Sequence, residues 1–236
     1  MTAHVVAMGG GGFLRHGDAS ALDRYVLSLV DAPAPNVCFV PTASGDPQPS
    51  IDLFHRVFEA LGCEHHHLSL FWRDEISVGD RIRDADVIYV HGGNTANLLA
   101  LWRLHGLDAA LEARRIDDRD LVVCGPSAGG LCWYECGVTD SFGPQLAPLD
   151  DGMAWVSGSF CPHYDEEPRR QPVYRELITS GRLPAGIAVD GGAATHSLDG
   201  TLHSVVAELP NATAHTLAMV HGALDERRLD VERLPV

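Results

Sequence analysis

Lysine is absent from this chain of 236 residues, so arginine supplies all 17 of its permanently basic side chains. This absence excludes a Schiff-base lysine, a Ser-Lys catalytic dyad and the lysine of a phosphate-binding P-loop. Any anionic group on a substrate must therefore meet arginine, whose planar guanidinium suits a carboxylate.

Long apolar runs and a positive charge balance are also missing. No apolar run approaches the roughly 20 residues that a membrane-spanning helix needs. The formal net charge of -15 disfavours contact with the phosphate backbone of a nucleic acid. The N-terminus has no basic region or cleavage-site pattern, which predicts a first strand and not a signal peptide. We therefore expect a cytoplasmic protein without nucleic-acid or membrane partners.

The six cysteines contain no CxxC pair, so we expect reduced thiols. Thirteen histidines include the run His65-His66-His67, of which only His65 and His67 share one face of a strand. A solvated strand edge explains this run better than a metal site does. The sequence therefore predicts no metal and no cofactor.

Short β-branched runs alternate with helical patterns through the first two-thirds of the chain. This alternation predicts an α/β fold, with a mostly parallel sheet sandwiched by helices and an active site at the carboxyl ends of the strands. We treat residues 1–236 as one domain. Strands are expected at 4–8, 36–41, 64–70, 86–91 and 121–125, and helices at 19–31, 48–61, 95–114 and 128–136.

The last third has a different pattern, in which strand-like pieces follow one another through short turns. This pattern predicts antiparallel strands added to the edge of the sheet, with one helix near 170–180. The strands are expected near 158–162, 186–190, 202–208 and 215–220.

Four consecutive glycines, Gly9 to Gly12, follow the first expected strand. A dinucleotide site needs spaced glycines and an acidic residue about 20 positions later, and the end of the second strand holds Pro41-Thr42-Ala43-Ser44 instead. A tight loop that lines the floor of an active site is the favoured interpretation.

The strongest local signal lies at residues 121–130, where an apolar strand runs into G-x-S-x-G and then a helix. Such a turn strains the serine and exposes its hydroxyl at a helix N-terminus. Ser127 is therefore the predicted nucleophile, and the amide of Ala128 is a predicted oxyanion donor. The alternative is a glycine-rich turn with an inert serine.

A second strand ends in His91-Gly92-Gly93-Asn94-Thr95. Gly93 can supply the second oxyanion amide, although a simple glycine turn explains the same pattern. Asn94 is a candidate helix cap that can also face the substrate.

Several motifs together resemble peptidase E, a family of serine peptidases on a class I glutamine-amidotransferase-like fold. They occur in the same order through most of the chain: GGNT at 92–95, GPSAGG at 125–130, CWYE at 132–135, TDS at 139–141 and CPHYD at 161–165. The resemblance implies hydrolysis of dipeptides, often those with N-terminal aspartate. Cyanophycinase is a more distant relative on the same scaffold.

The family motif selects His163 as the general base for Ser127. The imidazole needs a carboxylate partner, and two residues compete for that role. Glu135 is favoured because an acid on the apolar elbow helix needs a partner, whereas Asp140 is explained equally well as a turn residue. The choice between them stays open.

An aspartate side chain on the substrate calls for an arginine. Arg169 and Arg170 occupy the corresponding region, although pairing with Glu166 or Glu167 at a helix start explains them equally well. Asp165, Glu166 and Glu167 are candidates for binding the free ammonium of a peptide. A small peptide is the expected partner, and a homodimer is left open.

Two other readings compete with a peptidase. An α/β-hydrolase esterase would combine Ser127 with Asp190 and either His215 or His221. A non-catalytic binding protein on the same scaffold would leave Ser127 unused. A glutamine amidotransferase is disfavoured because that chemistry uses cysteine where Ser127 stands.

Overall fold

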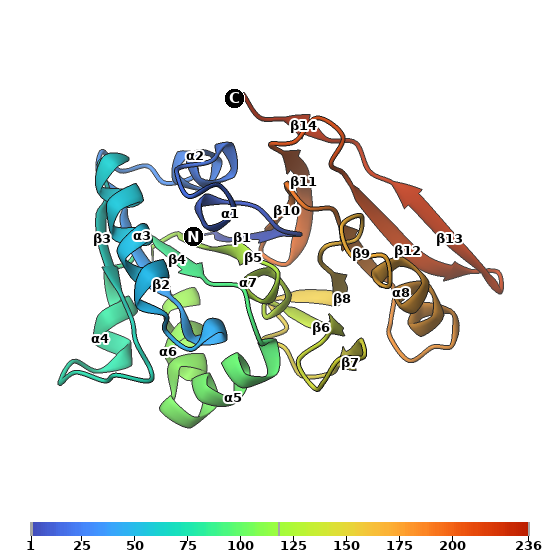
Figure 1. Ribbon diagram of the computed structural model, residues 1–236, viewed down its shortest axis with the longest axis horizontal. Helices are drawn as coiled ribbons and strands as arrows, with labels where there is room; N and C mark the ends of the chain where they lie inside the picture. Colours follow the sequence, from blue (N-terminus) through green and yellow to red (C-terminus); the bar gives the residue numbers. More distant parts are fainter. Residues whose placement is uncertain (1, 118, 236) are drawn as a thin grey trace.

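The computed structural model describes residues 2–117 and 119–235. One eight-stranded sheet has the order β14-β11-β10-β1-β5-β4-β2-β3, and the five strands from β1 to β3 in this order run parallel (Figure 1). Two antiparallel strands, β10 and β11, extend it on the other side of β1. The strands are β1 (Ala3–Met8), β2 (Asn36–Val40), β3 (Glu64–His67), β4 (Val87–Val90), β5 (Leu121–Pro126), β10 (Ala193–Leu198), β11 (Thr201–Ala207) and β14 (Glu232–Arg233).

Alternate side chains of the parallel strands face two separate cores, because successive residues of a strand point to opposite sides. On β1, Val6 and Met8 contribute to one core with Phe13, while Val5 and Ala7 contribute to the other. The first core is covered by α1 (Phe13–His16), α2 (Ala21–Ser28) and α3 (Gln48–Ala60), and the second by α4 (Val78–Arg83), α5 (Thr95–His105) and α6 (Leu107–Arg115).

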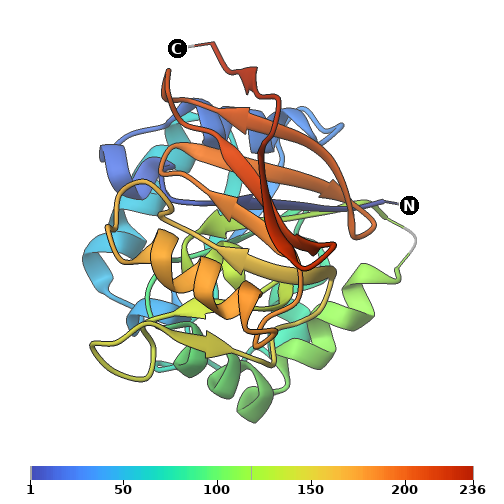
Figure 2. The ribbon, with the colours of Figure 1, turned by 90° about the vertical axis from the view of Figure 1, so that its right-hand side faces the viewer.

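A second, six-stranded sheet has the order β13-β12-β9-β8-β6-β7. Its β6, β8 and β9 are parallel neighbours, and the outer strands are antiparallel. The helix α8 (Arg170–Thr179) packs against β12 and β13, in front of this sheet in Figure 2. The strands are β6 (Tyr134–Thr139), β7 (Ala147–Leu149), β8 (Val156–Cys161), β9 (Gly186–Val189), β12 (Ala214–Val220) and β13 (Ala223–Arg228).

The predicted α/β class is confirmed, and so are the antiparallel strands of the last third. These strands do not all extend one edge, however, because β8, β9 and β12 belong to the second sheet, and β8 is parallel to both of its neighbours. The helix expected at 95–114 is divided at Gly106, which has the left-handed φ of 71° that ends α5.

The helix expected at 128–136 is wrong beyond its first turn. It comprises only α7 (Ala128–Leu131), and β6 begins at Tyr134. β6 contains Tyr134, Val138 and Thr139, and aromatic and β-branched residues pack well on a pleated sheet. No helix within the described ranges has the length and hydropathy needed to cross a bilayer.

Candidate active site

Ser127 occupies a sharp turn between β5 and α7. Its φ of 55° and ψ of -113° are unusual for a residue with a side chain, and such strain concentrates at functional sites. The turn lies directly against the end of β4, because a Cβ atom placed on Gly125 or Gly129 would lie 2.1 or 2.2 Å from the Val90 oxygen. Glycine at these two positions is therefore what allows the turn to pack.

The end of β1 holds the backbone of both Ser127 and His163. The amide of Ser127 donates to the Met8 oxygen, and the amide of His163 donates to the Gly9 oxygen, each over 3.0 Å. Two successive carbonyl groups thus anchor the main chains of residues that are 36 positions apart in the sequence.

The base candidate His163 follows β8 and carries its own backbone strain, with a φ of 53°. Its Nδ1 lies 3.0 Å from Oε2 of Glu166. Because a carboxylate only accepts hydrogen bonds, Nδ1 carries a proton, so in the neutral ring Nε2 is the nitrogen with the lone pair. This tautomer is the one that a general base needs.

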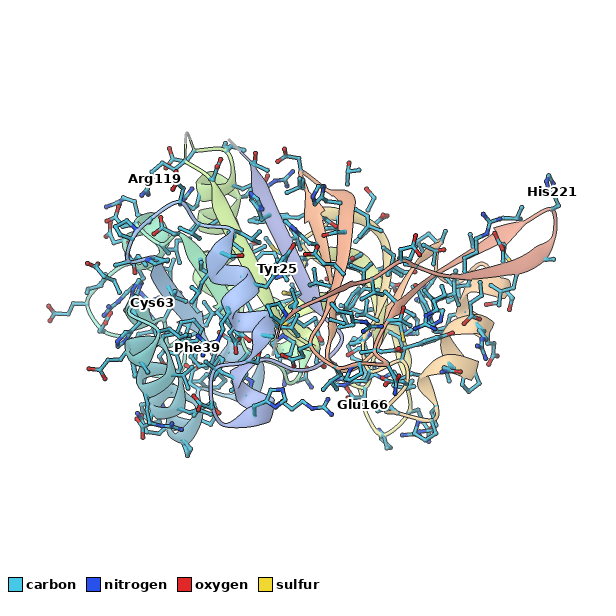
Figure 3. The ribbon with its side chains drawn as sticks, turned by 90° about the horizontal axis from the view of Figure 1, so that it is seen from above. Tyr25, Phe39, Cys63, Arg119, Glu166 and His221 are labelled. Atoms are coloured by element: carbon cyan, nitrogen blue, oxygen red, sulfur yellow. The ribbon has the colours of Figure 1, made fainter. Side chains whose placement is uncertain are left out.

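Glu166 has a second partner, since Arg15 of α1 donates to its other oxygen. Burial opposes ionisation of Glu166, but the hydrogen bonds from His163 and Arg15 outweigh it and hold the pKa of this carboxyl below its ordinary value. The carboxylate therefore remains charged near neutral pH. Figure 3 shows Glu166 between the N-terminal helices and the second sheet.

Glycines from two loops make room for the side chains of His163 and Glu166. A Cβ on Gly10 would lie 2.9 Å from the His163 ring, and one on Gly191 would lie 2.2 Å from the Glu166 carboxylate. The glycine run after β1 thus lines the floor of the site, as the sequence predicts.

The glycine turn after β4 lies beside the nucleophile. A Cβ on Gly92 would be 3.6 Å from the Ser127 Cβ, so the main chain passes very close to it. Ala128 is the first residue of α7, where an amide has no partner within the helix. Of the predicted donors, Ala128 thus follows Ser127 directly, and Gly93 belongs to the glycine turn that passes beside it.

Neither predicted acid contacts His163. Glu135 lies on strand β6 and not on the elbow helix; its side chain is exposed and accepts from the Gly158 amide over 3.2 Å. Asp140 is an exposed residue just after the same strand. The carboxylate that the structure places against His163 is Glu166, because alternation along β6 turns Glu135 outward.

The side-chain amide of Asn94 makes two hydrogen bonds within the protein, one through its oxygen and one through its nitrogen. Its side-chain oxygen caps α5 by accepting from the Asn97 amide over 2.8 Å, and its nitrogen donates to the Ser141 oxygen over 2.9 Å. The predicted cap is therefore confirmed, and the substrate role stays a prediction.

The two predicted substrate arginines differ sharply. Arg170 is 3% exposed, and its guanidinium donates to Glu167 and to the Val138 oxygen. It braces α8 against β6 and is not available to a substrate. Arg169 is exposed at the start of α8.

Carboxylates gather around His163 and Glu166. Asp165 accepts from the Gly191 amide over 2.8 Å, and Asp190 accepts from the Thr213 amide over 3.0 Å. Burial and the nearby charge of Asp165 raise the pKa of Asp190 to about 6. The local field favours a cation.

The esterase alternative would combine Ser127 with Asp190 and either His215 or His221, and both of these histidines lie elsewhere in the fold than His163. Figure 3 places His221 at the tip of the β12–β13 hairpin, which projects away from the rest of the molecule. His215 lies on β12 with its ring against Tyr164. Asp190 accepts from the Thr213 amide, and the structure shows no hydrogen bond between this carboxylate and either His215 or His221.

The histidine run on β3 meets a further histidine from α3. His55 Nδ1 lies 2.9 Å from His65 Nδ1, and His55 Nε2 lies 2.9 Å from His67 Nδ1. His65 and His67 do share a face, as predicted. Among the described residues, no cluster has the arrangement needed to hold a metal ion.

Glu166 as the partner of His163, and Arg15 as the partner of Glu166, were not predicted from the sequence. The spacing H-x-x-E at 163–166 was the available signal, because residues three apart meet on one turn. Arg15 had no local signal, since it comes from 151 residues away.

Comparisons with known proteins identify the family of this chain. The model of peptidase family S51 matches residues 5–205. The uncharacterised peptidase YgaJ of Bacillus subtilis (strain 168) is 44% identical over 230 residues, which cover 98% of each chain.

Two solved structures share the fold. A peptidase from an acI-B1 actinobacterium superposes with a TM-score of 0.69 at 18% identity, covering 98% of this chain and 94% of its own. A protein from Listeria monocytogenes EGD-e, provisionally named peptidase E, superposes with a TM-score of 0.56 at 16% identity, covering 98% and 100%. The family match and the 44% identity show that the chain belongs to peptidase family S51, a family of serine-type peptidases.

Proposed function

We propose that this chain hydrolyses short peptides, dipeptides above all, through a triad of Ser127, His163 and Glu166. The observation that carries the proposal is the attachment of Ser127 and His163 to the carbonyls of Met8, the last residue of β1, and of Gly9 just after it, with Glu166 fixing the tautomer of His163. It combines a strained nucleophile, a base and an orienting acid.

In the proposed reaction, Ser127 Oγ attacks the scissile carbonyl and His163 Nε2 takes its proton. The amides of Gly93 and Ala128 stabilise the negative oxygen that forms. His163 then returns the proton to the leaving amine, and water hydrolyses the acyl-enzyme by the same route. Glu166 stabilises the imidazolium throughout.

Charge around the site supports a peptide with a free amino end. Asp165 and Asp190 lie beside His163 and Glu166, and an ammonium group is the natural partner of such carboxylates. Preference for N-terminal aspartate is a finer proposal. It calls for an available guanidinium, and Arg169 is the exposed member of the predicted pair.

The test is a panel of dipeptides that differ in the N-terminal residue, including aspartate and alanine. We expect turnover that withstands a chelator, disappears in Ser127→Ala and falls about 10³-fold or more in His163→Ala. His215→Ala is the control and should retain activity. Turnover that survives Ser127→Ala, or that is lost only in His215→Ala, would contradict the proposal.

A further inference from the structure

His91 stands at the carboxyl end of β4, immediately before the two glycines that approach Ser127. Its Nδ1 lies 2.5 Å from the Gly92 oxygen, and its Nε2 lies 3.1 Å from Oγ of Ser50 on α3. The ring also packs against Phe39, with 5.7 Å between the ring centroids. Both nitrogens of a half-buried histidine are thus engaged within the protein.

These contacts define the tautomer of His91. A carbonyl oxygen only accepts hydrogen bonds, so Nδ1 must donate to Gly92, and Nε2 can then accept from the Ser50 hydroxyl. Burial lowers the pKa of His91, which favours the neutral ring that this pattern uses.

Among the described residues, main-chain hydrogen bonds anchor the peptide between Gly92 and Gly93 only at its flanks. The His91 amide donates to the Val40 oxygen over 3.1 Å, and the Asn94 amide donates to the Ala43 oxygen over 2.8 Å. A peptide between two glycines rotates more freely than any other, because neither residue has a Cβ. Its orientation therefore needs a further restraint.

Glycine is nevertheless required here. Gly93 has a φ of 141°, and a Cβ on it would lie 2.3 Å from the Ala43 oxygen. The tight packing excludes the side chain that would otherwise restrict rotation, so the restraint must come from another residue.

We propose that His91 is a positioning residue, which holds the Gly92 carbonyl and thereby directs the Gly93 amide toward the oxyanion that forms at Ser127. In a planar trans peptide the carbonyl and the N–H point in opposite directions, so fixing one fixes the other. Within the described part of the chain, the Gly93 amide donates to no protein acceptor. This inference rests on the proposed serine-peptidase function.

Substitution of His91 by asparagine or by glutamine tests the two ring nitrogens separately. In His91→Asn the side-chain nitrogen takes the place of Nδ1 and can still donate to the Gly92 oxygen. In His91→Gln it takes the place of Nε2 and reaches toward Ser50 instead. His91→Phe keeps the ring against Phe39 without either nitrogen, and provides a second test should the glutamine variant fail to fold.

The probe is a fluorophosphonate, because its labelling of Ser127 needs the oxyanion site but no knowledge of the substrate. We expect labelling to slow about 10- to 100-fold in His91→Gln and His91→Phe, and to stay within about threefold of wild type in His91→Asn. On a cleaved dipeptide, kcat should fall with KM nearly unchanged, which a loss of folded protein alone would not produce.

The outcomes separate two kinds of failure. Equal labelling of wild type, His91→Gln and His91→Phe would overturn the positioning role and leave the proposed function intact. An equal loss in His91→Asn and His91→Gln would also overturn it, since the Nδ1 position would not matter. Wild-type protein that resists labelling, or labelling that persists in Ser127→Ala, would instead overturn the proposed function.

Discussion

Ser127 comes from one continuous strand-turn-helix segment of the first sheet, whereas His163 and Glu166 come from the loop between β8 and α8 of the second. The serine turn is shaped by its own glycines, Gly125 and Gly129, and by the strand next to it. The histidine is placed by docking, since its amide reaches Gly9 across the boundary between the sheets. One half of the site is therefore local in sequence, and the other depends on tertiary contacts.

This difference explains why the two halves respond to different changes. Glu166 receives hydrogen bonds from residues on both sides of the boundary, namely Arg15 and His163. Loss of its charge should disturb the chemistry without unfolding the chain. A clash at the serine turn should instead lower the stability of the fold, because the turn is packed against β4.

The largest expected effect is on catalysis in Glu166→Gln. The neutral amide removes the charge that stabilises the imidazolium, and its NH2 group can force the wrong tautomer on His163. We expect kcat/KM to fall about 10³-fold, equivalent to about 4 kcal/mol of transition-state stabilisation. Steady-state kinetics on the best dipeptide measures this loss.

Glu135→Gln and Asp140→Asn are the matched controls for that variant. Both side chains are exposed and are not bonded to His163 in the structure, so their kcat/KM should remain within about twofold of wild type. A greater loss in either control than in Glu166→Gln would return the orienting role to that residue.

The contrast between the halves also sets how much the sequence could reveal. Buried parallel strands are short apolar runs, and the glycines around Ser127 follow one of them directly. The strand-turn-helix segment around Ser127 can therefore be predicted from the local sequence pattern. Glu135 was misplaced because the elbow helix stops at Leu131, where the packing of β6 in the second sheet overrides helical spacing.

The link between Arg15 and Glu166 shows a second limit. These residues meet only because the loop after β1 and the loop after β8 dock together, and no periodicity encodes such a contact. The second sheet was missed for the same reason: its strands have the same apolar character as those of the first, and only the pairing separates them.

The next effect concerns the stability of the serine half. Gly129 is the second residue of α7, and a methyl group on it would meet the main chain of Val90 at 2.2 Å. We expect Gly129→Ala to lower the free energy of unfolding by about 3 kcal/mol, because backbone atoms cannot move aside cheaply. Urea denaturation followed by circular dichroism measures the change.

Gly79 provides the control, since it is also the second residue of a short helix, α4. Its added Cβ would find only the Ser77 Oγ, at 3.9 Å. Gly79→Ala should leave stability unchanged or raise it by up to about 1 kcal/mol through helix propensity. Equal destabilisation of the two variants would show that the packing against Val90 is not what requires glycine.

The smallest effect concerns the histidine half and the two arginines at the start of α8. Arg170→Leu leaves the buried Val138 oxygen without its donor, so we expect a loss of about 2 kcal/mol in urea denaturation. Arg169→Leu should change stability by less than about 0.5 kcal/mol because the side chain is exposed.

The same Arg169→Leu variant tests substrate recognition. If Arg169 binds the aspartate side chain of the substrate, its replacement raises KM for an aspartate-first dipeptide but not for an alanine-first one. Equal losses of stability would mean that Arg170 does not brace α8 against β6, and an unchanged KM for both peptides would remove Arg169 from substrate recognition.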